Sequence, residues 1–145
     1  MQNKITKVPI NIVDLDSSGF HITVFAKASR FKLNLLIDTG ASKSIFDINH
    51  KAFASFDLVQ LDDDIKSSGI NAEISGINAA IIPNFKIGDM RVTDMPALFM
   101  PFEHINNVYI ELEKKPIAGI IGGDFLLKYD AIIDYESKEL ILKIK

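Results

Sequence analysis

One short stretch limits the possible folds of this chain more than any other, because an aspartate directly follows an apolar strand in it. The apolar run Leu-Leu-Ile at residues 35–37 predicts a buried strand, and Asp-Thr-Gly-Ala-Ser follows it directly at residues 38–42. Thr39 is suited to hydrogen-bonding nearby backbone, and Gly40 permits a close approach that a Cβ would prevent. The pattern predicts a tight loop at a strand end, from which the carboxylate of Asp38 projects.

Short strands dominate the rest of the pattern. Alternating apolar and polar residues predict strands at 20–26 and from 31 onward, joined by a turn at 28–30, and a hairpin over 85–92 that turns at Gly88-Asp89. Further strands are expected at 5–12, 97–100, 117–121, 131–134 and 140–144, with two weaker candidates within 65–82 and a turn at 136–138. Short helices are expected at 48–56 and 124–129. With no Pro/Ser-rich linker, we expect residues 1–145 to form a single, mainly β domain.

Two segments far apart in the chain resemble each other. Residues 35–40 read LLIDTG and residues 119–124 read GIIGGD. Each is an apolar strand that breaks into small residues and is followed by a possible helix. Sequence alone leaves this echo open between chance and a structural relation.

Composition limits the classes of partner. The chain is 48% hydrophobic and 24% charged, with a net charge of −3, no Trp and no Cys. Without a basic block, a nucleic-acid partner is not expected. No run approaches the roughly 18 apolar residues of a membrane helix, and the N-terminus lacks the apolar core of a signal peptide. We therefore expect no membrane partner and a cytoplasmic location.

Residues 35–42 (LLIDTGAS) resemble the active-site motif of the retropepsin-like aspartic proteases. The second hallmark of that family, two apolar residues and a glycine before a short helix, stands here as IIG at 120–122 and GDFL at 123–126. The resemblance spans about residues 18–143. It implies a mainly β, retropepsin-like acid protease fold: a closed, barrel-like β half with a flap hairpin and one or two short helices.

The resemblance also implies a site. Asp38 is then the catalytic residue, within an active-site loop of Thr39, Gly40, Ala41 and Ser42. The residues expected to support this loop are Ile120, Ile121, Gly122 and Asp124. The flap is expected within 66–76, with its tip at Gly69, Ile70, Asn71 and Ala72. Such a site needs no metal and no other cofactor.

The number of Asp-Thr-Gly motifs in the chain determines how many copies an aspartate pair would need. The sequence has one Asp-Thr-Gly, and Asp14 and Asp134 follow apolar residues without it. An aspartate dyad therefore requires a homodimer with one Asp38 from each copy, acting on a peptide or protein substrate. Because Ala41 stands where many acid enzymes have Ser or Thr, a hydrogen bond to the carboxylate is lost, and we expect activity to shift toward neutral pH.

Two other functions stay open on the sequence. One is a catalytically inactive retropepsin-like module that binds peptides or dimerises, and the other is an unrelated β-barrel with a chance Asp-Thr-Gly. The chain departs from the compact retroviral enzymes by extra sequence after Ser42 and by an insertion at residues 77–116. The segment KELILKIK, residues 138–145, is a candidate for the edge of a dimer sheet.

Several features carry simpler explanations. The histidines are far apart in sequence and are expected at the surface or the core edge. The acidic run at 62–64 is expected in a solvated loop. The FMPF run at 99–102 is expected in the core. The serines near Asp38 lack a histidine in a nucleophile motif, and the Gly122-Gly123 pair is not a phosphate loop. The residues set aside in this way are His21, His50, His104, Ser42 and Ser44.

Overall fold

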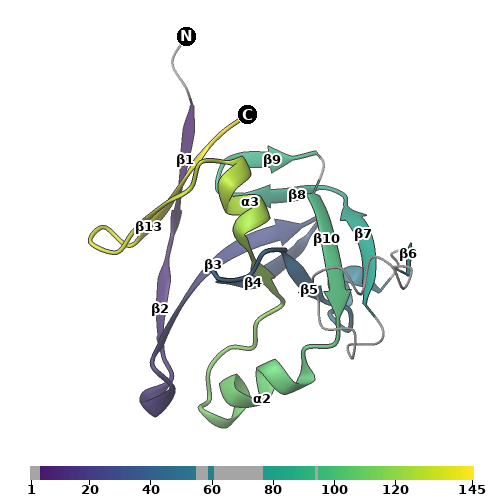
Figure 1. Cartoon of the computed structure of the whole chain (residues 1–145), viewed down its shortest axis with the longest axis vertical. Helices are drawn as coiled ribbons and strands as arrows, with labels where there is room; N and C mark the ends of the chain where they lie inside the picture. The colour runs from purple at the N-terminus through teal and green to yellow at the C-terminus, as the bar shows by residue number, and fades with distance from the viewer. Residues whose placement is uncertain (1–3, 55–58, 61–76, 94) are drawn as a thin grey trace.

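The computed structural model describes residues 4–54, 59–60, 77–93 and 95–145 of the chain (Figure 1). Within these residues the strands form two sheets. The larger is a curled ten-stranded sheet in the order β6-β7-β10-β5-β11-β4-β3-β8-β9, with β2 beside β3, and the smaller has the order β1-β13-β12. A mainly β architecture with two short helices confirms the fold class expected from the sequence.

Most of the described strands are short. Their bounds are β1 Ile5–Pro9, β2 Asn11–Asp14, β3 Phe20–Ala28, β4 Phe31–Ile37, β5 Ile45–Asp47, β6 Val59–Gln60, β7 Asn78–Ile82, β8 Phe85–Ile87, β9 Met90–Val92, β10 Met95–Met100, β11 Gly119–Ile121, β12 Ile132–Asp134 and β13 Glu139–Lys143. The helices are α2 Glu103–Glu111 and α3 Gly123–Lys128, and the 3-10 turns are η1 Asp16–Ser18 and η2 Lys51–Phe53.

The β3-β4 hairpin is the frame on which the motif is built. Leu33, Leu35 and Ile37 alternate along β4 and are buried in the main core, with both leucines fully enclosed. Burying one such side chain contributes about 1.5–3 kcal/mol, and a slip of one residue would expose all three. The period-two pattern therefore fixes the register of β4, and with it the position of the residue that follows, Asp38.

The predicted 85–92 hairpin is present as β8 and β9, paired through Ile87 and Met90. Gly88 in its turn has a φ of 57°, which favours glycine, and a Cβ there would collide with the side chain of Thr6 in β1. The hydroxyl of Thr6 accepts a hydrogen bond from the Asp89 N–H at 2.8 Å. This turn thereby joins the small sheet to the large one.

The small sheet places the C-terminal strand in its centre. β13 pairs with β1 on one side and with β12 on the other, both antiparallel. The segment 138–145 was a candidate for an open dimer edge. In the single chain, the open edges of this sheet belong instead to β1 and β12, and Ile132 on β12 is 56% exposed.

The helix expected over residues 48–56 is wrong in the described part of that stretch, where only the 3-10 turn η2 is helical. Side chains there bind backbone donors locally. Asp47 Oδ1 accepts from the Asn49 N–H at 3.0 Å, and His50 Nδ1 accepts from the Ala52 N–H at 3.0 Å. Bonds of this kind favour turns at the expense of helix.

Helix α2 was not predicted and lies within the 77–116 insertion. The buried amide of Asn106 bonds the backbone of Ile117 in both directions, at 3.0 and 2.8 Å. Tyr109, which is 2% exposed, packs with Leu15 and Phe102 in a second, smaller core. Because so short a helix is marginal alone in water, these tertiary contacts are what stabilise it.

Candidate active site

The two motif strands lie side by side in the large sheet (Figure 1). β11 runs parallel to β4, with Gly119 opposite Leu35 and Ile121 opposite Ile37. The strand parts of the two echoing segments, residues 35–37 and 119–121, therefore lie in register on adjacent strands. The Asp38 N–H donates to the Ile121 carbonyl at 3.0 Å. The carboxylate leaves the sheet where both motif strands end.

The loop after β4 folds back onto its own aspartate. The Gly40 N–H donates to Asp38 Oδ1 at 2.9 Å, and the Ala41 N–H donates to the Asp38 backbone carbonyl at 3.2 Å. A Cβ at Gly40 would lie 3.3 Å from that Oδ1, closer than ordinary contact. Asp38 is half-buried and Thr39 is exposed. Among the residues described, Oδ2 of Asp38 accepts no hydrogen bond, so one carboxylate oxygen is anchored and the other is available.

Two glycines after β11 close the far side of the loop. The Gly123 N–H donates to the Ala41 carbonyl at 2.6 Å. A Cβ on Gly122 would lie 2.7 Å from the Lys43 carbonyl oxygen and 2.8 Å from that of Ala41. Backbone oxygens cannot rotate away as a side chain can. The absence of a side chain at Gly122 is therefore what lets the loop backbone approach β11 this closely.

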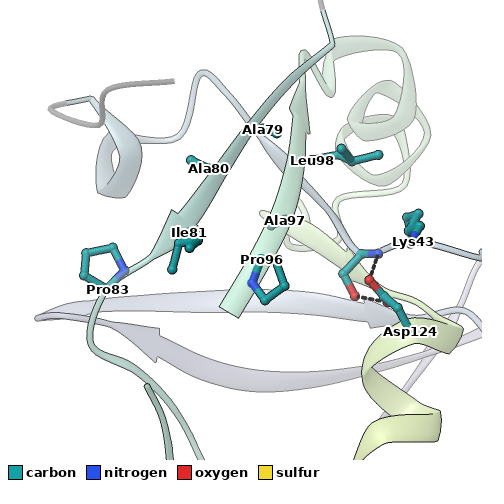
Figure 2. A pocket seen from close by; sticks show the side chains of 10 residues that line it. Lys43, Ala79, Ala80, Ile81, Pro83, Pro96, Ala97, Leu98 and Asp124 are labelled. Carbon is teal, nitrogen blue, oxygen red and sulfur yellow. Dashed lines mark hydrogen bonds between the residues drawn. The ribbon is translucent and has the colours of Figure 1, made fainter. Parts of the chain in front are cut away.

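A serine and an aspartate tie the end of the loop to helix α3. Ser44 is 1% exposed, and its Oγ donates to Asp124 Oδ1 at 2.8 Å while accepting from the Gly122 N–H at 3.0 Å. The Ser44 N–H donates to Asp124 Oδ2 at 3.1 Å (Figure 2). The Asp124 carboxylate also accepts from the Phe125 N–H at 2.8 Å. Charged acceptors strengthen such bonds, so this network fixes where the loop ends.

Asp38 opens onto a cavity of about 300 Å³. Its walls come from β3, β4 and the β12 end, and its large exposed side chains are Phe20, at 69%, and Tyr135, at 63%. The lining residues are Phe20, His21, Ile22, Leu36, Ile37, Asp38, Thr39, Ile133 and Tyr135. The lining combines apolar side chains with one carboxylate, the two hydroxyls of Thr39 and Tyr135, and an imidazole.

A histidine in this cavity is tied to helix α2. His21 Nδ1 lies 2.6 Å from the hydroxyl oxygen of Tyr109, which is buried. Burial raises the pKa of Tyr109, so its hydroxyl stays neutral and available as a donor. No local pattern indicates this pair, because the two residues are 88 positions apart in the chain. His21 is half-buried, in keeping with the core-edge position expected, but it also shares a cavity with Asp38.

A larger cavity, of about 790 Å³, lies beyond the far end of the loop (Figure 2). Lys43, Ser44 and Asp124 form one side of it, and strands β7 and β10 form the other. Asp38 does not line it. We assign the candidate chemistry to the smaller cavity, because a reacting group must lie within hydrogen-bond reach of its substrate.

The structure brings most of the predicted site residues together. Ile121, Gly122 and Asp124 contact the loop through the bonds and close approaches given above. Ile120 packs instead against the second core, beside α2. The flap residues Gly69 to Ala72 lie outside the described residues. Sequence reasoning weighed Ser44 only as a nucleophile and missed its role in closing the loop; a small polar residue at the start of a buried strand was the available signal.

The described residues contain no group of three metal-ligating side chains placed to bind one ion. No described helix has the length and apolar character needed to cross a membrane.

Comparison with known proteins decides the family. The sequence profile of the family described as aspartyl protease matches residues 27–125, more than half of the chain. The chain belongs to the aspartyl protease family. The matched range contains both motif strands of this family member, the loop between β4 and β5, and the start of α3. No curated protein sequence matches the chain.

Solved structures show the fold of this aspartyl protease family member to be retropepsin-like. It is similar to the crystal structure of a retropepsin-like aspartic protease from Rickettsia conorii, with a TM-score of 0.59 and 16% identity, covering 99% of this chain and 95% of that one. It is also similar to the retroviral protease-like domain of Ddi1 from Leishmania major, with a TM-score of 0.52 and 15% identity, covering 83% and 86%. At these identities the likeness is one of fold.

Proposed function

We propose that the chain is an aspartic endopeptidase that hydrolyses peptide bonds as a homodimer, with one Asp38 from each copy in a shared site. The observation that carries the proposal is the geometry around Asp38 in a member of the aspartyl protease family. One carboxylate oxygen is anchored by the Gly40 N–H, the other accepts no bond from the described residues, and the group faces a cavity large enough for substrate atoms.

The need for a second copy is supported by the local roles of the other candidate aspartates. Asp14 Oδ1 accepts the Asp16 N–H at 2.9 Å. Asp134 Oδ1 accepts the N–H groups of Glu136 and Ser137 at 3.0 and 3.1 Å. The backbone bond from Ser137 is the main reason that the pKa of Asp134 is lowered. Both carboxylates therefore stabilise turns, and neither is hydrogen-bonded to Asp38 in the described part of the chain.

Thr39 supports the same assembly. Its side chain is exposed, and its hydroxyl has no hydrogen-bond partner among the described residues. In a homodimer with the two loops facing each other, this hydroxyl would bond the backbone of the partner loop. Such a bond would align the two carboxyl groups across the two-fold axis.

The chemistry follows from bringing two carboxyl groups into contact. Both cannot ionise cheaply at that distance, so the pair shares one proton and titrates as a unit. The ionised member takes a proton from a water molecule as it attacks the peptide carbonyl, and the protonated member donates a hydrogen bond to the carbonyl oxygen. The same groups then return a proton to the leaving amine. Because Ala41 cannot donate a side-chain hydrogen bond, activity is expected nearer neutral pH.

A peptide-library digest tests the proposal. Wild type is compared with Asp38→Asn, which keeps the size and one acceptor oxygen, and with Asp134→Asn as a matched change in a turn. Cleavage is expected from wild type and Asp134→Asn and not from Asp38→Asn. Cleavage that survives the Asp38 change refutes the mechanism.

Subunit mixing tests the shared site separately. Wild-type chains are titrated with an excess of Asp38→Asn chains, while sedimentation equilibrium reports the mass. If two carboxyls are needed, activity per wild-type chain falls as mixed dimers replace wild-type dimers. A strictly monomeric protein without activity would instead favour the peptide-binding module, and activity that is unchanged by mixing contradicts a shared site.

A further inference from the structure

Four cationic side chains lie in one row across four adjacent strands. Lys32 on β4 is opposite Lys27 on β3, Lys27 is opposite Lys86 on β8, and Lys86 is opposite Arg91 on β9. Directly opposite residues of antiparallel strands project from the same face of the sheet. All four are exposed. With adjacent strands about 4.8 Å apart, the row is about 14 Å long.

A fifth cation joins this face beside an aromatic ring. Phe25 lies two residues before Lys27 on β3 and so projects from the same side. The Nζ of Lys32 lies 4.1 Å from the centroid of the Phe25 ring, and the Nζ of Lys115 lies 4.9 Å from it. We call Lys27, Lys32, Lys86, Arg91 and Lys115 together the basic face.

The basic face is not compensated within the described chain. Like charges directly opposite each other destabilise a sheet. The ion pairs of the described residues join Asp130 to Lys143 and Lys145, and none involves the basic face. The whole chain is acidic, with 19 acidic and 16 basic residues. Five of its 16 basic residues gather on one face, where their mutual repulsion opposes folding. An anionic partner from outside the chain would relieve this repulsion.

We propose that the basic face binds an acidic polypeptide segment, rich in Asp and Glu. The chemistry of the face favours this partner over a nucleic acid, because single-stranded nucleic acid needs open aromatic rings for base stacking and lysines lie over the ring of Phe25. An anionic membrane presents its charge over a wide surface and so also meets the net charge of −3 of the whole chain, whereas a short segment meets only the basic face. Beyond a Debye length of about 8 Å the local attraction is screened, so only a short, close partner benefits fully.

The basic face is a separate site from the candidate active site. Asp38 directly follows β4 and is six residues after Lys32, or about 20 Å in an extended chain. An acidic segment on this face would have to be joined to a scissile bond at Asp38 by about six or more extended residues. Binding at the basic face does not depend on the proposed catalysis and can be measured without cleavage.

Fluorescence anisotropy tests the binding on the full chain carrying Asp38→Asn. The probes are a labelled peptide with alternating Glu residues and the same peptide with Gln in their place. The row variant Lys27→Gln/Lys86→Gln is compared with Lys7→Gln/Lys128→Gln, which removes the same charge from exposed lysines elsewhere. We expect the Glu peptide to bind and the Gln peptide not to. The row variant should weaken binding about five- to thirtyfold, and the control less than about twofold.

Three results overturn the proposal. Equal binding of the Glu and Gln peptides excludes a charge-based site. If the row and control variants lose the same affinity for the Glu peptide, the binding depends on net charge and not on the basic face. An oligonucleotide or a phosphatidylserine vesicle that binds through the row, while the Glu peptide does not, excludes a polypeptide partner. Thermal unfolding supplies a second readout: relief of repulsion should leave the row variant at least as stable as wild type.

Discussion

Ser44→Ala is the substitution that most directly probes how the loop is closed. It deletes the bond from Ser44 Oγ to the Asp124 carboxylate and leaves the buried Gly122 N–H without its acceptor. A buried donor without a partner costs about 1–3 kcal/mol, and a bond to a charged group contributes about 1.5–3 kcal/mol. Asp124 keeps the N–H donors of Ser44 and Phe125, so the contribution of the lost bond to its carboxylate is at the low end of that range. We expect a loss of about 2.5–4.5 kcal/mol in the free energy of unfolding.

Urea unfolding followed by circular dichroism measures this loss, since the chain has no Trp. For a chain of this size the loss corresponds to a fall in Tm of about 8–18 °C. Ser42→Ala is the matched control, because Ser42 is exposed and its change should stay within about 0.5 kcal/mol. In a double-mutant cycle, Ser44→Ala and Asp124→Ala should couple by about 1–3 kcal/mol. A Ser44→Ala protein as stable as the Ser42→Ala control would refute the reasoning.

Three more outcomes are expected, all measured by chemical unfolding. Gly122→Ala should cost about 1–3 kcal/mol because its Cβ meets backbone oxygens, whereas Gly123→Ala, with its nearest contact at 3.4 Å, should be neutral or stabilising; equal losses would contradict the steric argument. Burial lowers the pKa of His50, so wild-type stability should fall as pH drops below 6.5. His50→Asn keeps an acceptor for the Ala52 N–H and should reduce this dependence of stability on pH. Burial raises the pKa of Tyr109, so wild-type stability should fall as pH rises above 10. Tyr109→Phe should remove that part of the pH dependence, at a cost near neutral pH of about 1 kcal/mol. If the pH dependence is unchanged in the His50 or the Tyr109 variant, that residue is not the titrating group.

The parts of the fold that could be predicted are those that local sequence patterns determine. Alternation in β4 and the turn at Gly88 each fix a structure within a few residues. The motif at 35–42 and its echo at 119–124 gave the two strands that meet beside Asp38. That match did not need tertiary information, because small residues after an apolar run are informative on their own.

The parts that were missed depend on contacts between distant residues. α2 is stabilised by the bonds of Asn106 to Ile117 and of Tyr109 to His21, which no periodicity in 103–111 reveals. The helix expected at 48–56 failed because side chains compete there for backbone donors. The basic row exists only through strand register, since its members are spread from Lys27 to Arg91. The flap stays a prediction.

The closure of the loop by Ser44 and Asp124 joins groups 80 residues apart in the chain. A ribosome that adds 5–20 residues per second takes about 4–16 s to make the intervening polypeptide. During that interval Asp38 has been made, but the strand that accepts its N–H and the helix that fixes its loop do not yet exist. The proposed hydrolase would therefore stay inert during its own synthesis, because its active-site loop closes only after Asp124 has been made.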